Sequence, residues 1–192
     1  MELLLQVLLN GILQGGLYAL MALGLALAWG VLNIVNLAHG AFIMLGGYVV
    51  WWLYSRTGID PFALLPVAAL VLFAIGYAVQ RGILNLVIRG PMFNTLLITF
   101  GVEVVLTYLA QIIFSADYRT INPDYAGRSI TLAEITLPLI KLAAFALALT
   151  LTLTMWLFLL RTRVGRRIRA TAQNLTAARL YGVEPRHLYA LT

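Results

Sequence analysis

Five long runs of apolar residues constrain the fold of this chain more than any other feature. They cover approximately residues 12–31, 37–54, 62–80, 94–114 and 139–160, and the apolar stretch 3–9 extends the first one toward the N-terminus. A helix needs about 20 apolar residues to cross the hydrocarbon core of a bilayer. Lipid offers the backbone no hydrogen-bond partner, so such runs must bond internally as helices. We therefore predict an all-α, polytopic transmembrane bundle of about five spans.

Composition supports a membrane protein and excludes several other classes. Hydrophobic residues make up 62% of the chain and charged residues only 10%, whereas soluble domains are roughly 25% charged. The formal charge of +6 does not indicate nucleic-acid binding, because no binding motif accompanies it and the arginines lie beside apolar runs. Membrane lipid is the expected surface. The absence of cysteine excludes disulfides, thiolate metal sites and a cysteine nucleophile.

The last 32 residues fix the expected orientation of the chain. Residues 161–192 hold seven of the thirteen Lys and Arg residues, and basic residues in short loops are retained on the cytoplasmic side. Counting back through the spans places Arg81 and Arg89 inside as well, and the loop 115–138 and the N-terminus outside. We therefore divide the chain into a transmembrane region, 1–160, and a cytoplasmic segment, 161–192, in the inner (plasma) membrane.

The outer loop 115–138 carries two local signals. Asn122-Pro123-Asp124 predicts a turn. Thr131 and Glu134, three residues apart, form a capping box, which predicts a short amphipathic helix. The loop is either a connector at the membrane interface or part of a platform for an external partner.

Polar residues recur at every fourth position of the fourth apolar run. They are Thr95, Thr99, Glu103, Thr107 and Gln111. Steps of four residues keep side chains on one slowly drifting stripe of a helix. Lipid cannot satisfy such a stripe, and an ionised Glu103 near the middle of the membrane is costly. Two interpretations remain open: hydrogen bonding between helices, with Thr150 and Thr154 as partners, or the lining of a solute path.

A second polar group lies between the first two runs. Only about five residues separate these runs, which predicts a tight turn or a broken helix. Asn33, Asn36 and His39 in this stretch can satisfy freed backbone groups or meet a polar solute. His39 has no second ligand in the sequence pattern, so no metal site is predicted.

The sequence offers no catalytic motif. It contains no H-E-x-x-H, G-x-S-x-G or Walker-type G-x-x-x-x-G-K-[ST] pattern. We predict neither enzyme activity nor a cofactor for this chain. If ATP drives its function, other subunits must hydrolyse it.

Three blocks of sequence carry a family resemblance. They are N-L-A-H-G-A-F-I-M-L-G-G-Y (36–48), V-I-R-G-P (87–91) and G-R-R-I-R-A-T-A-Q-N-L-T-A-A-R-L-Y-G-V (165–183). With these blocks the chain resembles, over essentially its whole length, the permease subunits of branched-chain amino acid ABC transporters. The resemblance implies an importer with a second permease subunit, two cytoplasmic ATPase subunits and an extracytoplasmic solute-binding protein. We expect its solute path to include Asn33, Asn36, His39, Thr99 and Glu103.

The third block resembles the E-A-A-x-x-x-G motif by which importer permeases contact their ATPases. Thr176 stands at the position of the acidic residue. We expect a coupling helix over residues 166–181, preceded by Gly165 and ended by Gly182. One of its faces, formed by Ile168, Ala172, Leu175 and Ala178, would seat in an ATPase groove. The expected coupling residues are Gly165, Arg166, Ala177, Ala178 and Gly182. The alternative is a basic helix lying on anionic lipid headgroups.

The sequence ends at Thr192, where members of the family continue into further spans. The resemblance thus covers about the N-terminal two-thirds of such a permease, which we interpret as a fragment or a truncated product. The expected function is the permease subunit of an importer for branched-chain amino acids. The alternatives are an ABC permease for urea or short amides, a secondary transporter or channel using Glu103, and a truncated fragment that transports nothing.

Overall fold

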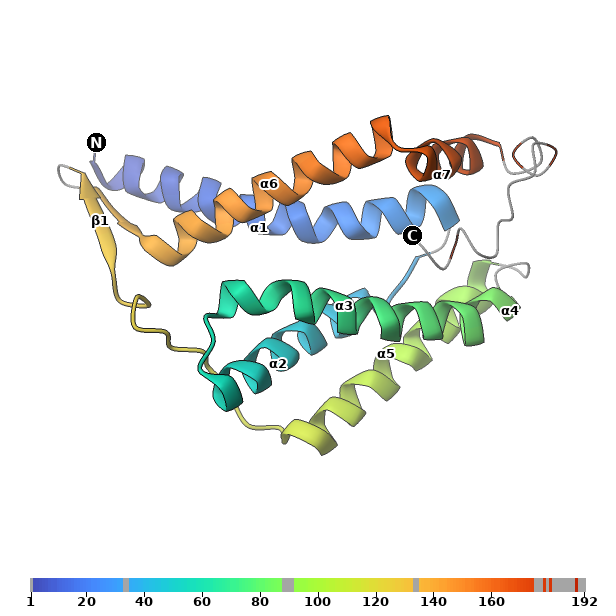
Figure 1. Cartoon of the computed structure of the whole chain (residues 1–192), viewed down its shortest axis with the longest axis horizontal. Coiled ribbons are helices and arrows are strands. Elements are labelled where there is room, and N and C mark those ends of the chain that lie inside the picture. Colours follow the sequence, from blue (N-terminus) through green and yellow to red (C-terminus); the bar gives the residue numbers. More distant parts are fainter. Residues whose placement is uncertain are drawn as a thin grey trace. The chain divides into compact units, whose positions relative to one another are not determined.

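The chain is mostly helical, as the sequence predicts. The computed structural model describes residues 2–32, 35–87, 92–132, 135–174, 178, 180 and 189. The elements in chain order are α1 (Glu2–Leu32), α2 (His39–Thr57), α3 (Pro61–Val79), the π-helical turn η1 (Gln80–Leu84), α4 (Asn85–Val87), α5 (Met92–Phe114), β1 (Ser129–Leu132), β2 (Ile135–Pro138), α6 (Leu139–Arg161) and α7 (Arg163–Gln173) (Figure 1).

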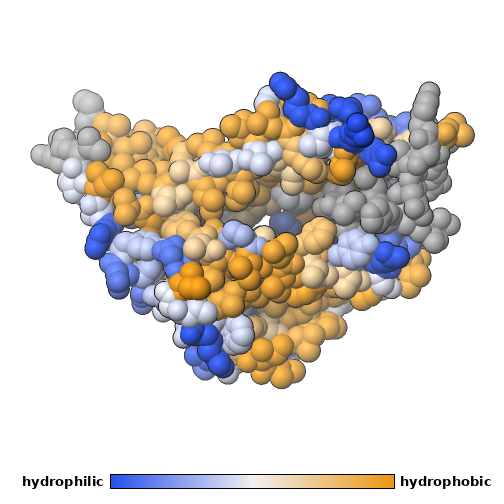
Figure 2. Space-filling model, viewed as in Figure 1, coloured by the Kyte–Doolittle hydropathy of each residue, from blue (hydrophilic) through white to orange (hydrophobic). Residues whose placement is uncertain are grey.

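Four stretches of helix are long and apolar enough to cross a membrane. They are Leu3–Val31, Pro61–Val87, Phe93–Phe114 and Leu139–Arg161, and they coincide with four of the five predicted spans. Much of the visible surface is apolar (Figure 2), and large side chains such as Leu70 and Ile112 are 70% and 78% exposed. Water would penalise such a surface and lipid would not. The chain is therefore a multi-pass membrane protein.

The second predicted span forms a helix but stands apart from these four. Helix α2 has 19 residues, almost enough to cross the hydrocarbon core at 1.5 Å per residue. It is not among the stretches apolar enough to qualify as a span. Glycine, tyrosine and tryptophan interrupt its aliphatic residues, at Gly46, Gly47, Tyr48, Trp51 and Trp52.

The chain divides into two compact units. The first contains residues 1–26 and 122–166, and the second contains residues 27–121 and 167–192.

Helices α2, α3 and α5 lie in the second unit. Gly58 ends α2 in the left-handed conformation (φ 67°), where its N–H donates to the Tyr54 carbonyl at 2.9 Å. Two residues later the Asp60 carboxylate accepts from the Phe62 N–H at 2.8 Å and caps α3. Because this connection is so short, α2 and α3 pack as neighbours. Their buried core consists of Val50, Leu64 and Ala68, packed by residues that include Leu53 and Ile121.

In the first unit, polar residues of α1 hold the hairpin and α6. The Gln6 side-chain amide pairs with the backbone of Thr136 in β2: its Nε2 donates to the carbonyl at 2.6 Å, and its Oε1 accepts from the N–H at 2.9 Å. One turn later, Asn10 Oδ1 accepts from Lys141 Nζ of α6 at 3.3 Å. These polar residues of the first span thus satisfy partners within the protein.

The hairpin β1–β2 corrects one prediction. Thr131 does not cap a helix; it lies in β1, paired with Thr136 of the antiparallel strand β2. Apolar and polar residues alternate in Ile130-Thr131-Leu132 and again in Ile135-Thr136-Leu137, and this pattern of β-branched residues favours strands over a helix. Glu134 lies outside the described residues.

The predicted turn at Asn122-Pro123-Asp124 is confirmed. The Ala126 N–H donates to the Pro123 carbonyl at 2.8 Å.

The contact of Gly16 with α6 provides a test of the first unit. A Cβ at Gly16 would overlap the ring of Phe145, whereas a Cβ at Gly15 would meet open space. We expect Gly16→Leu to lower the free energy of unfolding by about 1–3 kcal/mol through overpacking. The matched control Gly15→Leu should change it little. Detergent-induced unfolding of both variants measures the difference, and equal stabilities would contradict this packing.

Candidate functional site

The turn before α2 is built around the side chain of Asn36. Its Oδ1 accepts from the Ala38 N–H at 3.1 Å, and its backbone carbonyl accepts from the His39 N–H at 3.3 Å. This Asx-type turn starts α2 at His39. The prediction that an asparagine satisfies freed backbone groups here is confirmed for Asn36. Asn33 lies outside the described residues.

Thr99 connects α5 to this turn. Its Oγ1 accepts from the Leu37 N–H at 3.3 Å and lies 3.2 Å from the Val35 carbonyl and 3.0 Å from the Leu96 carbonyl. The hydroxyl has one proton, which it donates to one of these carbonyls at a time. Thr99 has no exposed surface. A buried side chain of α5 therefore satisfies backbone groups of the turn before α2.

The polar stripe of α5 is buried only at its N-terminal end. Thr95 and Thr99 are 1% and 0% exposed, Glu103 and Thr107 are half-buried, and Gln111 is exposed. The prediction that the stripe faces protein is thus confirmed for its first two members.

The two threonines expected as partners of the stripe bond within their own helix. Thr150 Oγ1 donates to the Ala146 carbonyl at 2.8 Å, and Thr154 Oγ1 donates to the Thr150 carbonyl at 2.7 Å.

A cavity of about 220 Å³ lies beside Asn36 and Thr99 in the second unit. Two of the five predicted path residues, Asn36 and Thr99, line it, and His39 and Glu103 do not. The other lining residues are Ala28, Ala38, Phe42, Phe73, Gly76, Tyr77, Val79, Gln80, Leu84, Val102 and Tyr189. None of these residues is charged. The cavity can therefore offer hydrogen bonds and apolar contacts, but its described lining carries no acid or base.

Two polar residues of this cavity, Tyr77 and Gln80, were not predicted from the sequence. Gln80 is 7% exposed, and its Nε2 donates to Asn85 Oδ1 at 3.3 Å. It begins η1, and π-helical turns of this kind occur often at functional sites. A glutamine at the end of an apolar run is the one sequence signal that could have identified it. Arg81 Nη1 donates to the Tyr77 hydroxyl at 2.8 Å.

The described residues contain no group of three His, Asp or Glu side chains that could hold a metal ion.

The junction of α6 and α7 depends on one hydroxyl group. Thr162 Oγ1 donates to the Phe158 carbonyl near the end of α6 at 2.7 Å and accepts from the Gly165 N–H at the start of α7 at 2.9 Å. It therefore caps α7 and satisfies a carbonyl of α6 at once. A Cβ at Gly165 would overlap the carbonyl oxygens of Phe158 and Leu159, so this close turn requires glycine.

These contacts correct the expected start of the coupling helix. Helix α7 begins at Arg163, so Gly165 lies inside it instead of preceding it. The helix starts earlier because Thr162 supplies its N-cap. Ala178 is buried, and its N–H donates to the Asn174 carbonyl at 3.0 Å. Ala177 and Gly182 lie outside the described residues.

The exposed residues of α7 are mainly basic, and the expected apolar seat is contradicted only for its two buried members, since Ala172 is exposed. Ile168 and Ala178 are 3% and 5% exposed, so neither side chain is free to enter a groove on another protein. Leu175 lies outside the part of the chain that the structure describes. The exposed residues include Arg163, Arg166, Arg167 and Arg169. Arg166 makes one long hydrogen bond, from Nη1 to the Arg161 carbonyl at 3.5 Å.

The membrane spans place the chain in the class of multi-pass membrane proteins. The sequence model of the family described as "Branched-chain amino acid transport system / permease component" matches residues 7–192. The chain belongs to this family, whose members are membrane components of ABC transport systems.

Named relatives show the same similarity. The chain is 26% identical to the high-affinity branched-chain amino acid transport system permease protein BraD of Pseudomonas aeruginosa, over 98% of this chain and 65% of BraD. It is 27% identical to LivH of Escherichia coli K12, with the same two coverages. It is 26% identical to a probable LivH of Methanocaldococcus jannaschii, over 91% of this chain and 57% of that protein. The chain thus spans slightly less than two thirds of the length of these relatives. No solved structure matches it.

Removing the Thr99 hydroxyl tests its structural role. Thr99→Val keeps the shape of the side chain but leaves the Leu37 N–H without this acceptor. We expect a loss of about 1–3 kcal/mol in the free energy of unfolding. Thr107→Val, two turns along the same stripe and half-buried, is the matched control and should cost less. Detergent-induced unfolding compares the variants, and a loss no larger than the control's would contradict this role.

The hydroxyl at the α6–α7 junction can be tested by limited proteolysis. Thr162→Val removes both hydrogen bonds of the side chain, at a cost of about 1 kcal/mol in local stability. We expect trypsin to cleave faster after Arg161 and Arg163. Thr162→Ser keeps the hydroxyl and should restore the wild-type cleavage rate. Equal rates in the Val and Ser variants would show that the hydroxyl does not hold the junction.

Proposed function

We propose that this chain is a permease subunit of an ABC importer that moves branched-chain amino acids across the inner membrane. The observation that carries the proposal is the family match over residues 7–192, which includes three of the four candidate membrane spans and most of the first. The named relatives are themselves described as branched-chain amino acid permeases. Because the chain spans only 65% of their length, its activity and partners are inferred from them.

In this proposal the cavity beside Asn36 and Thr99 is part of the solute path. Its lining provides hydroxyl and amide groups without a fixed charge, so a solute can gain hydrogen bonds there without a deep electrostatic trap. Asn33, His39 and Glu103 complete the path in other conformations. The π-helical turn at Gln80 marks a point where α3 can change its register.

The proposed orientation places residues 161–192 in the cytoplasm and the N-terminus outside, with α2 as a fifth span. The exposed arginines on and before α7 support this orientation, since such residues stay on the cytoplasmic side. Two ATPase subunits would contact the segment that contains Arg166, a second permease subunit would complete the pathway, and an extracytoplasmic binding protein would deliver the solute. Closure of the ATPase pair would shift the spans between outward-open and inward-open states.

Charge reversal on α7 tests the ATPase contact. We expect Arg166→Glu to reduce co-purification of ATPase subunits by about tenfold, because it replaces an attractive surface charge with a repulsive one. Uptake of radiolabelled leucine into membrane vesicles should fall in parallel. Arg128→Glu, an equal charge change at an exposed position outside α7, is the control. Unchanged ATPase recovery and uptake in Arg166→Glu would refute the contact.

The same vesicles separate the proposed function from its rivals. ATP-driven import continues in the presence of a protonophore and stops when ATP is depleted. A secondary transporter that uses Glu103 would show the opposite behaviour and would be inactivated in Glu103→Gln. Competition of uptake by urea or acetamide, but not by leucine, would indicate the other cargo class.

A further inference from the structure

A second hollow, on α2, combines an aromatic wall with a pair of opposite charges. It has a volume of about 570 Å³ and lies between Met44, Tyr48 and Trp51 of α2 and the loop residues Asp117, Arg119 and Ile121. We call it the α2 groove. Positions 44, 48 and 51 share one face of the helix and span about 10 Å along its axis. The described lining of the first cavity has no charge, so the two sites differ in chemistry.

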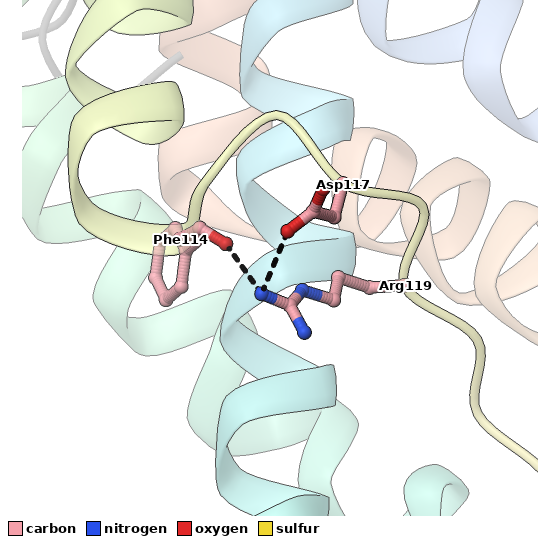
Figure 3. A network of polar contacts seen from close by, with 3 residues as sticks. All are labelled: Phe114, Asp117 and Arg119. Atoms are coloured by element: carbon pink, nitrogen blue, oxygen red, sulfur yellow. Dashed lines mark hydrogen bonds and ion pairs between the residues drawn. The ribbon is translucent and has the colours of Figure 1, made fainter.

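Two kinds of contact hold the Arg119 guanidinium in the α2 groove: the polar contacts of its Nη2 and a cation–π contact with the Trp51 ring. Its Nη2 donates to the Phe114 carbonyl at 3.2 Å and lies 3.7 Å from Asp117 Oδ2 (Figure 3). The guanidinium carbon lies 4.8 Å from the centre of the Trp51 ring. Within the described residues, the Nε and Nη1 groups of Arg119 have no hydrogen-bond partner. They remain available as donors to a carboxylate.

Asp117 supplies the opposite charge at the same end of the groove. Its side chain is 78% exposed, and its one described partner is the long ion pair with Arg119. An exposed ion pair at this distance contributes little to stability, so it can open at little cost. A ligand that carries a cation and an anion close together would satisfy both side chains.

The wall of the groove is aromatic and rigid. The rings of Tyr48 and Phe114 stack with centroids 4.9 Å apart, and the Trp51 ring meets Phe114 edge-on at 6.4 Å. Ile121 packs against the core of α2 and α3. Apart from the charged pair, the described lining is apolar and aromatic surface with two phenol groups, those of Tyr48 and Tyr118. An aliphatic side chain can lie along this wall and lose its contact with water.

We propose that the α2 groove binds a free α-amino acid with an apolar side chain. The α-carboxylate bonds to Arg119, the α-ammonium bonds to Asp117, and the side chain lies along Tyr48 toward Met44. A ligand with only one of the two charges would be attracted by one residue and repelled by the other, so the pair selects a zwitterion. This inference rests on the proposed function only for the choice of leucine as the ligand to be tested.

The competing explanation is structural. Ser115 ends α5 with a φ of 67°, and Arg119 closes this end by bonding to the Phe114 carbonyl and stacking on Trp51. A purely structural Arg119 would affect every ligand equally. Selectivity among ligands that differ by one charge therefore separates the two explanations.

The experiment measures binding of three ligands to the full chain in lipid nanodiscs by titration calorimetry. They are L-leucine, leucinamide, which lacks the carboxylate, and isocaproate, which lacks the ammonium group. We expect leucine to bind at least about tenfold more tightly than either analogue.

Asp117→Asn should weaken leucine binding by about tenfold and leave isocaproate binding unchanged or stronger. Arg119→Gln should weaken leucine and isocaproate binding and spare leucinamide. Asp124→Asn, an equal charge change in the same loop, is the control.

Two outcomes would overturn the groove as an amino-acid site. One is the absence of leucine binding up to about 10 mM. The other is an equal loss for all three ligands in the Asp117 and Arg119 variants. Either result with ATP-driven leucine uptake intact would leave the proposed function standing. A different result is selective leucine binding when no ATPase subunits co-purify with the chain and no uptake occurs. That result would support the groove as a binding site and contradict the proposed function.

Discussion

Backbone groups at the ends of helices must find partners inside this protein, because lipid provides none. Polar side chains within apolar sequence meet that need. Thr99 bonds to the turn that precedes α2, and Thr162 satisfies the end of α6 and the start of α7 with one hydroxyl. Gln6 acts in the same way for β2: its side-chain amide bonds to both the carbonyl and the N–H of Thr136, as the backbone of a neighbouring strand would. At these three described breaks in regular structure, a polar side chain thus bonds to backbone groups.

The same constraint explains why the cavity beside Asn36 and Thr99 lies next to the turn before α2. A turn such as that at Asn36 interrupts the close packing of α2 against its neighbours, and the side chains that satisfy its backbone are the ones that line the resulting space. Polar residues that stabilise the fold and polar residues that can meet a solute are therefore partly the same. This overlap explains why Thr99 both bonds to backbone groups of the turn and lines the cavity, where a role in a solute path remains a proposal.

The sequence was sufficient to predict the helices and part of the site. The apolar runs, with the first extended over residues 3–9, predicted the helix ends to within a few residues. The exception is the helical stretch that begins with α3, which continues through η1 and α4 to Val87. The α5 stripe was identified, but each step of four residues rotates its direction by about 40°, so the stripe has turned by about 120° between Thr99 and Gln111. This rotation accounts for a buried Thr99, a half-buried Glu103 and an exposed Gln111.

The π-helical turn could not be predicted, since a single extra residue per turn leaves no periodic signal. The hairpin was missed because Thr131 and Glu134 also fit a capping box.

The α6–α7 junction shows how a force on the basic surface can reach the membrane. The hydroxyl of Thr162 bonds to the carbonyl of Phe158 and to the N–H of Gly165, and the absence of a side chain at Gly165 lets the backbones approach closely. A rotation of α7 relative to α6 would break at least one of these bonds and leave a backbone group unsatisfied. Arg166 follows this junction by four residues and is exposed, so a partner that binds it acts through a short and stiff connection. In the proposed function, a charged contact on the exposed arginines would therefore act on α6 through this junction and would not need an apolar seat on the ATPase.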